Sequence, residues 1–383
     1  MGKKEKTKRF KTRRGKLSAI AGIVTLAVAI VIVYIFVKGG GKLDLSVIRD
    51  LRIGDSTRPA DTFALNSDRS EVAAALDDGF FTAGKLGVTV LDKAGEALHR
   101  DTVPMKNAAV KAAGEYAVAY DIGGRTALVY DLNGMTARIN AGGEIVDASV
   151  NADGWFTVCA QEGGGFKGKC SVYNREGETV FYFDSSTGYL LSAAITDDCK
   201  SLYVMTLTPT GSRLLFFNLN SNEEQWELSL PGEVALEIKG AQKDGLWVIS
   251  DKALTAVSRE GGQNKIFGFD GRHIGGYSLE RGEPIALMLL SYGVGTKGQI
   301  ITLRETGEVL GTMDTNRRLK DILSAGKYVY VLWADGFEIY GTELKEVLET
   351  GESANAGAIV ARGAREVYIV DGGEAVRIDG GLQ

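Results

Sequence analysis

Histidine and proline are scarce in this chain of 383 residues. The sequence contains two histidines, His99 and His273, and five prolines. Metal centres with several histidine ligands are therefore excluded, and a Ser-His-Asp or Cys-His mechanism would have to use one of these two residues. Few prolines beside 50 glycines exclude collagen-like and proline-rich linker classes and favour many tight turns. The composition therefore disfavours most hydrolase chemistry.

Basic residues are concentrated at the N-terminus and are outnumbered elsewhere. Residues 1–16 contain nine lysines and arginines and a single acid, Glu5. The rest of the chain carries 35 basic and 48 acidic side chains, a net charge of −13. A basic tail of this kind is a solvated arm that can attract anionic lipid or phosphate. Because the other basic residues are scattered over an acidic region, we predict no nucleic-acid partner.

A long uncharged segment follows the basic tail. Leu17 to Val37 contains 21 residues without a charge, enough for a helix that crosses about 30 Å of hydrocarbon. We predict a single transmembrane helix here. The excess of basic residues before it predicts a cytoplasmic N-terminus and an extracellular remainder. A signal peptide cleaved at Ala27-Val28-Ala29 is the alternative, but eight apolar residues follow that site, so an uncleaved anchor is favoured.

The extracellular part consists of short β-strand patterns that recur at a fixed interval. Eight apolar phrases, such as Ala127-Leu128-Val129-Tyr130-Asp131, each end in a polar or turn-forming residue, and their last residues are 41 apart on average. These last residues are Asp92, Asp131, Asn174, Asn218, Ser258, Arg304, Tyr340 and Asp379. The interval suits four short strands per unit. The prediction is an all-β fold, a β-propeller.

The repeat units define the predicted domain boundaries. We predict eight blades over residues 45–383 and a linker at residues 38–44, while seven blades would result if the unit from Glu71 to Arg100 is irregular. The eighth unit lacks an evident fourth strand after Asp379. We therefore expect a strand from Leu43 to Ile53 to complete that blade and to remove an exposed edge.

The repeat pattern resembles membrane-anchored β-propellers of the broad quinoprotein-like and WD40-like superfamily. The resemblance rests on the interval and on segments such as Asn218 to Trp226, and it covers residues 45–383. The Gly-His and Trp-Asp dipeptides of WD40 blades are missing, and no unit carries the full quinoprotein docking phrase. The layout of tail, span and propeller is similar to single-pass families of Gram-positive bacteria. The resemblance implies the fold and leaves the activity open.

Two of the three cysteines are predicted to face each other. Cys159 and Cys170 flank a hairpin centred on Gly164-Gly165, which suits a two-residue turn. In that register the two residues are directly opposed, at a separation that a disulfide tolerates, and an exported location permits oxidation. The alternative is a pair of small buried thiols that stay reduced. Cys199 has no partner motif and is interpreted as structural.

The other conspicuous side chains are interpreted as structural. The acidic pairs Asp77-Asp78, Asp197-Asp198 and Glu223-Glu224 do not have the spacing of a calcium loop and are predicted to be solvated turn residues. Trp155, Trp247 and Trp333 are predicted to be core residues packed between blades.

The sequence contains no recognisable catalytic constellation. We predict no catalytic, cofactor-binding or metal-binding residues, and no cofactor. The expected function is a non-catalytic binding or scaffolding module at the cell envelope, with an envelope protein or polysaccharide as its partner. The alternative is a propeller enzyme outside the membrane, either a quinone-dependent oxidoreductase or a polysaccharide lyase.

Overall fold

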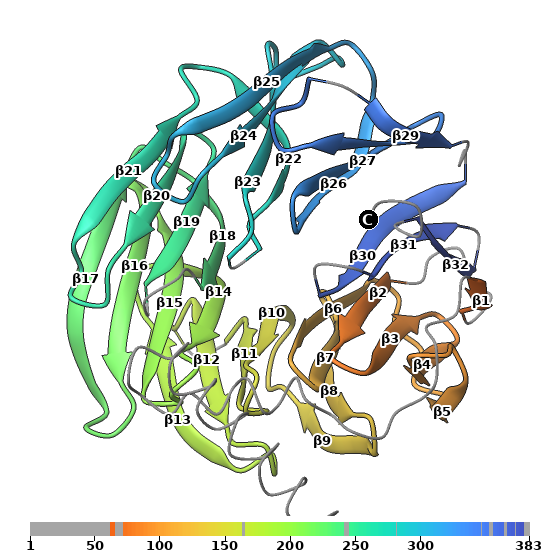
Figure 1. The fold of residues 1–383 in the computed structure, drawn as a ribbon. Coiled ribbons are helices and arrows are strands. Elements are labelled where there is room, and N and C mark those ends of the chain that lie inside the picture. Colours follow the sequence, from red (N-terminus) through yellow and green to blue (C-terminus); the bar gives the residue numbers. More distant parts are fainter. Residues whose placement is uncertain are drawn as a thin grey trace, which may run out of the picture. The chain divides into compact units, whose positions relative to one another are not determined.

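The computed structural model describes residues 62–65, 72–162, 165–240, 245–280, 282–345, 347–351, 355–363, 366–371 and 373–378. These residues form eight antiparallel sheets of four strands each, arranged as a ring (Figure 1). The prediction of an all-β propeller with eight blades is therefore confirmed. Blades are numbered here in chain order, so that blade 1 begins at β2 and blade 8 begins at β30.

The first strand of each blade lies nearest the centre of the ring, where it contacts the first strands of neighbouring blades. These inner strands are β2 (Val72–Leu76), β6 (Ala108–Ala113), β10 (Ile145–Val150), β14 (Tyr189–Ile195), β18 (Ala235–Gly240), β22 (His273–Ser278), β26 (Leu319–Ala325) and β30 (Ala356–Arg362). The second strands are β3 (Gly79–Gly84), β7 (Tyr116–Asp121), β11 (Phe156–Ala160), β15 (Ser201–Thr208), β19 (Leu246–Ser250), β23 (Ile285–Leu290), β27 (Tyr328–Trp333) and β31 (Glu366–Asp371).

The third and fourth strands of each blade complete the sheet towards the rim. The third strands are β4 (Gly87–Asp92), β8 (Thr126–Asp131), β12 (Gly168–Tyr173), β16 (Gly211–Asn218), β20 (Ala253–Val257), β24 (Gly298–Leu303), β28 (Phe337–Gly341) and β32 (Glu374–Arg377). The outer strands are β5 (Ala97–Asp101), β9 (Gly134–Asn140), β13 (Thr179–Ser185), β17 (Glu223–Pro231), β21 (Gln263–Gly268), β25 (Val309–Thr315), β29 (Val347–Gly351) and β1 (Thr62–Ala64).

An N-terminal strand closes the ring, as predicted, but different residues form it. β1 pairs antiparallel with β32, Thr62 opposite Val376 and Ala64 opposite Glu374, and so becomes the outer strand of blade 8. The segment Leu43 to Ile53, which we expected in this place, lies outside the described residues. Joining the two ends of the domain in one sheet leaves blade 8 with the same four strands as the others.

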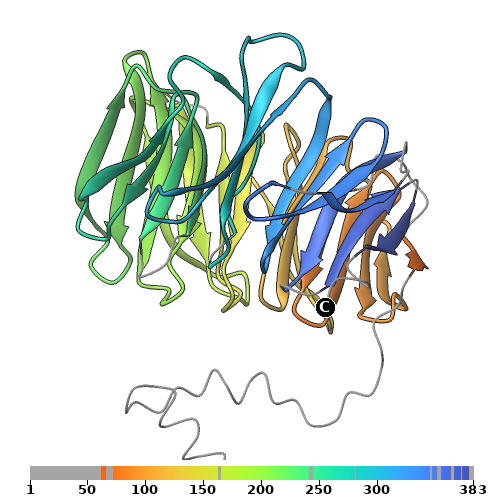
Figure 2. The same cartoon turned by 45° about the horizontal axis from the view of Figure 1, so that its top comes forward.

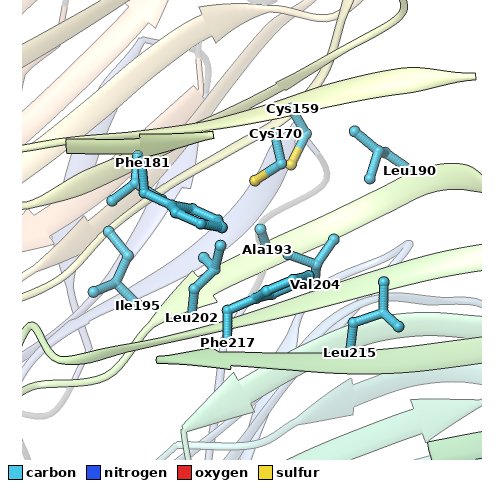
Figure 3. Close-up of a cluster of buried hydrophobic side chains, with 11 residues drawn as sticks. Cys159, Cys170, Phe181, Leu190, Ala193, Ile195, Leu202, Val204, Leu215 and Phe217 are labelled. Carbon is cyan, nitrogen blue, oxygen red and sulfur yellow. The ribbon is translucent and has the colours of Figure 1, made fainter. Parts of the chain in front are cut away.

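The hydrophobic core is divided among the interfaces between neighbouring blades. One cluster packs Phe181 from blade 3 against Leu202 and Val204 from blade 4 (Figure 3). A fully buried side chain of this size contributes about 1.5–3 kcal/mol to the free energy of unfolding. Trp247 and Trp333 are buried in two other such clusters, which confirms the prediction that they are core residues. Trp155 is half-buried against the cluster of Figure 3.

Two of the three acidic pairs lie in turns, and the third does not. Asp77-Asp78 and Asp197-Asp198 occupy the turns between the first and second strands of blades 1 and 4, as predicted. Glu223-Glu224 instead opens the outer strand β17, so the prediction of a turn was wrong there. The turn ends one residue earlier at Asn222, whose φ of 57° marks the left-handed position. Both glutamates are exposed, because an outer strand is solvated on its free edge.

The predicted tail, transmembrane helix and linker all fall before Thr62, outside the described residues. Among the residues that the structure does describe, no helix has the length and apolar character needed to cross a bilayer.

Candidate functional site at one mouth of the central channel

The inner strands surround a pocket of about 520 Å³. Its walls come from β2, β6, β10, β14 and β18, and they contain many alanines, including Ala74, Ala112 and Ala193. Small side chains leave space at the centre of the ring, whereas the second strands are almost completely buried in the blade interfaces. The lining residues lie towards the ends of the inner strands and in the turns that follow. The pocket is therefore one mouth of the central channel.

A lysine and an aspartate from adjacent blades form an ion pair in this wall. Lys111 of β6 lines the pocket, and its Nζ lies 2.5 Å from Oδ1 of Asp147 on β10. The Lys111 side chain is 35% exposed and that of Asp147 only 7%. The Tyr120 hydroxyl donates to the same carboxylate oxygen at 3.0 Å. Burial raises the pKa of Asp147, and Lys111 and Tyr120 counteract part of that rise.

A β-bulge brings Asp147 into this position. The register between β10 and β11 shifts between Ile145 and Asp147, so one strand carries an extra residue at that point. The bulge redirects the following side chain, as bulges near functional sites commonly do. Oδ2 of Asp147 consequently accepts from the backbone N–H of Ala193 on β14, at 3.4 Å. Asp147 thus connects blades 2, 3 and 4.

A second ion pair and an acidic residue contribute to the other side of the pocket. Lys239 of β18 lies 2.6 Å from Glu280, which follows β22. Both side chains are more than one third exposed, so this pair is screened by solvent. Glu237 also lines the pocket, and it accepts a hydrogen bond from Tyr277 of the next blade; burial and this carboxylate raise the pKa of the Tyr277 hydroxyl. The site thus offers cationic and anionic groups side by side.

The turns of blades 3 and 4 form part of the rim of the pocket. Asn151 lines it, and its Nδ2 donates to Sγ of Cys199 at 3.1 Å. Burial raises the pKa of the Cys199 thiol, which keeps it protonated and supports the structural interpretation. Partial burial opposes ionisation of Asp198, but hydrogen bonds, one of them from Arg259, lower its pKa overall. Asp198 is ion-paired with Arg259 at 3.1 Å, and its neighbour Asp197 lines the pocket.

Sequence reasoning found the core tryptophans but missed the charged residues of the pocket. The available signal was one or two charged side chains inside an otherwise apolar strand: one each in Ala108–Ala113 and Ile145–Val150, and two in Ala235–Gly240. His99 lies on the outer strand β5 and His273 at the start of β22, and neither lines the pocket. In the described part of the chain, no group of three or more His, Cys, Asp or Glu residues has a geometry that could hold a metal ion.

The cysteine register predicted from the sequence is confirmed. Cys159 of β11 is the direct partner of Cys170 on β12, and both thiols are free and fully buried (Figure 3). A hydrogen bond to Cys170 and burial raise the pKa of Cys159. The connecting turn is wider than predicted, because the paired strands end at Ala160 and begin again at Gly168.

The disulfide itself stays a prediction. For the full-length chain isolated from its native membrane, we expect mass spectrometry after alkylation to find Cys159 and Cys170 joined in one peptide and Cys199 alkylated. Recovery of all three cysteines in alkylated form would contradict it.

Residues 56–379 match DUF5711, a family of unknown function. The chain belongs to this family. The matched range contains every strand of the propeller, from β1 to β32. No curated protein matches the chain.

Solved structures of distant proteins have the same fold as this chain. BamB from Moraxella catarrhalis has a TM-score of 0.56 and 14% identity, over 85% of this chain and 98% of that chain. Saccharomyces cerevisiae Sqt1 has a TM-score of 0.59 and 11% identity, over 84% and 99%. The C-terminal WD40 domain of Sif2 has a TM-score of 0.58 and 11% identity, over 83% of this chain and 94% of that chain. At this identity the likeness shows the β-propeller fold alone.

Proposed function

We propose that this DUF5711 protein is a single-pass membrane protein whose extracellular propeller is a non-catalytic binding module, with the channel pocket as its receptor site. The observation that carries the proposal is the convergence of five inner strands on one pocket that two ion pairs border, Lys111 with Asp147 and Lys239 with Glu280. Paired charges on a rigid ring recognise a complementary group without needing to move a proton. The basic tail and the segment Leu17 to Val37 support the anchoring.

The pocket favours a polar partner segment with groups of both signs. Lys111 and Lys239 present ammonium groups, and Glu237 and Glu280 present carboxylates, around a wall of small side chains. A loop or chain end of an envelope protein satisfies all four groups, and we propose it as the ligand. An envelope polysaccharide is the alternative that the binding experiment separates.

The binding experiment compares a pocket variant that conserves net charge with a control variant, both made in the full-length chain. Lys239→Gln combined with Glu280→Gln keeps side-chain size but removes one pair from the pocket. The control, Lys327→Gln, changes an exposed lysine in the turn before β27, outside the pocket. We expect the pocket variant to lose about tenfold in partner recovery from native membranes, with the control unchanged. Equal recovery from both variants would contradict the pocket as the receptor site.

Two further measurements test the rest of the proposal. In intact cells, an antibody should reach an epitope at the C-terminus but not one at the N-terminus; the opposite result would contradict the topology. The purified full-length chain should contain no stoichiometric metal or quinone, and finding one would restore the enzyme alternative.

A further inference from the structure

A cluster of exposed aromatic rings and lysines surrounds the end of blade 3 that carries the turn between β11 and β12. Lys167 and Tyr189 lie towards blade 4, while Lys169 and Tyr182 lie on the sheet face that points away from blade 4. Phe166 precedes β12, Tyr182 is on the outer strand β13 and Tyr189 begins β14; their side chains are 43%, 56% and 58% exposed. Lys167 Nζ lies 5.2 Å from the ring centre of Tyr189, and Lys169 Nζ lies 4.3 Å from that of Tyr182. These five residues are called the aromatic–lysine cluster. We propose that it is a docking site for a protein segment that carries carboxylates beside apolar side chains.

The cluster has the composition of an interface centre. Large rings exposed to water cost free energy that a partner recovers by covering them, and Tyr and Phe lose little conformational entropy when they are buried. The rings are also held in place, because Tyr182 is paired within a sheet and Tyr189 begins one. Lys169 is paired loosely with Asp184, at 3.7 Å, and stays available to a stronger anionic partner.

Surface charge on this side of the ring favours an acidic partner. The ring has two faces (Figure 2), and the cluster lies on the face that carries the turns between second and third strands. In blades 1 to 4 the exposed charged residues in the described turns and connections of this face are Lys85, Lys106, Arg125, Lys167 and Glu144. The corresponding residues in turns of the other face are Asp77, Glu96, Asp153, Glu176, Glu178, Asp197, Asp198, Arg175 and Lys200. A basic face on an acidic domain attracts carboxylates and accelerates their encounter.

Two features favour a protein segment over other occupants. A sugar would stack on open ring faces, but ammonium groups already lie over the rings of Tyr182 and Tyr189. A second copy of the chain could offer its acidic face, yet none of the exposed large apolar residues lies in the described turns of that face. The cluster also extends from a turn onto the outer strand β13, so it does not lie on a single plane as a bilayer contact would.

The test is photo-crosslinking in the cells that make the full-length chain. The photoreactive residue p-benzoylphenylalanine replaces Phe166, and in the control it replaces Tyr292, an exposed tyrosine in a turn of blade 6. We expect a protein adduct at position 166 and none at 292. Lys167→Glu with Lys169→Glu should lower the adduct about tenfold, while Lys252→Glu in the matching turn of blade 5 should leave it unchanged. Thermal melts of all variants establish that they fold.

The adduct must also respond to charge exchange. Once the crosslinked segment is identified, changing two of its carboxylates to lysine should restore the adduct with the Lys167→Glu, Lys169→Glu variant. Four outcomes would each overturn the inference. They are an adduct with lipid, glycan or a second copy of the chain; equal adducts at positions 166 and 292; no adduct at all; and a protein adduct whose yield does not change with the charge substitutions. It rests on the proposed binding function, but a partner that needs the channel pocket and not this cluster would overturn the cluster alone.

Discussion

Blades 3 and 7 place an aspartate at the same point of the channel wall and compensate its charge differently. Asp147 and Asp321 each follow a β-bulge in an inner strand, and each accepts from a backbone N–H of the next blade. Asp147 also binds Lys111, whose ammonium lines the pocket. The carboxylate of Asp321 accepts instead from the N–H groups of Ile322 and Ile359, both at 2.8 Å.

The two aspartates differ in whether their partner lines the pocket. Burial raises the pKa of both carboxyls, so each needs partners to stay ionised. Backbone amides supply them in blade 7, where the side chain serves only to connect blades. In blade 3 the partner is a flexible cation, and holding it presents a positive charge to the pocket. The same bulge therefore connects two blades in blade 7, and in blade 3 it also holds a cation at the pocket.

Removing the carboxylate of blade 3 has the largest expected effect. Asp147→Ala should lower the free energy of unfolding by about 3 kcal/mol, because it leaves a buried tyrosine hydroxyl without its acceptor and Lys111 without its counter-charge. Equilibrium denaturation of the full-length chain measures it. Glu224→Ala, an exposed acid on β17, is the control and should change stability by less than about 0.5 kcal/mol. A loss of unfolding free energy no larger than that of the control would show that Asp147 does not join the blades.

The corresponding change in blade 7 should cost less. Asp321→Ala leaves the N–H groups of Ile322 and Ile359 unpaired, which costs about 2 kcal/mol because Asp321 is only half-buried and water can replace it in part. Asp321→Asn keeps one acceptor and should lose about half as much. Partner recovery should stay at the wild-type level for both variants, since Asp321 does not line the pocket. A loss of binding would remove the distinction between the two blades.

The third prediction concerns pH and tests whether Lys111 compensates the charge of Asp147, a role that no lysine has for Asp321 in the hydrogen bonds described above. Lys111→Met should cost about 1–2 kcal/mol at pH 7 because it leaves a buried carboxylate without its cation. It should also raise the pKa of Asp147 further above the unfolded value of about 3.9. The folded state then binds more protons than the unfolded state, so stability falls as pH rises through this window. The cost of the substitution should therefore shrink as pH is lowered towards 4.

Denaturation curves at several pH values measure the effect of Lys111→Met. Lys327→Met, which changes an exposed lysine, is the control and should show no pH-dependent difference from wild type. A cost that is constant from pH 4 to pH 7 would mean that Lys111 does not hold the charge of Asp147.

The fold could be predicted from the sequence because its repeat is local. Blades 1 to 7 are each a meander of four consecutive strands, so the apolar phrases that end at residues such as Asp131 and Asn218 recur once per blade. The closing strand was misplaced because β1 is only three residues long and pairs with residues more than 300 positions away. A segment that short has no periodicity to detect.

The pocket could not be predicted because its geometry depends on contacts between blades. Lys111 and Asp147 are 36 residues apart, and a bulge at Asp147 decides where the carboxylate points. A bulge that contains no glycine has no residue pattern by which a single sequence predicts it. The register of Cys159 and Cys170 was predicted correctly because both residues lie in one hairpin, whose strand pairing is local in the sequence.

The smallest expected effect comes from a hydroxyl of blade 3 that blade 7 lacks. Two residues after Asp147, Ser149 Oγ donates to the carbonyl of Ala193 at 2.7 Å, so blade 3 holds both the N–H and the C=O of that residue. The corresponding position in blade 7 is Leu323. Ser149→Ala should cost less than about 1 kcal/mol, because Thr157 Oγ1 lies 3.5 Å from the same carbonyl and can replace the donor.

Combining Ser149→Ala with Thr157→Val removes both donors and should cost clearly more than the sum of the two single substitutions. Chemical denaturation of the three variants measures this coupling. Strict additivity would mean that Thr157 does not substitute for Ser149. The Ala193 carbonyl would then be solvated from the pocket. The side-chain contact of blade 3 with the backbone of Ala193 would be the hydrogen bond to Asp147 alone, as Asp321 makes in blade 7.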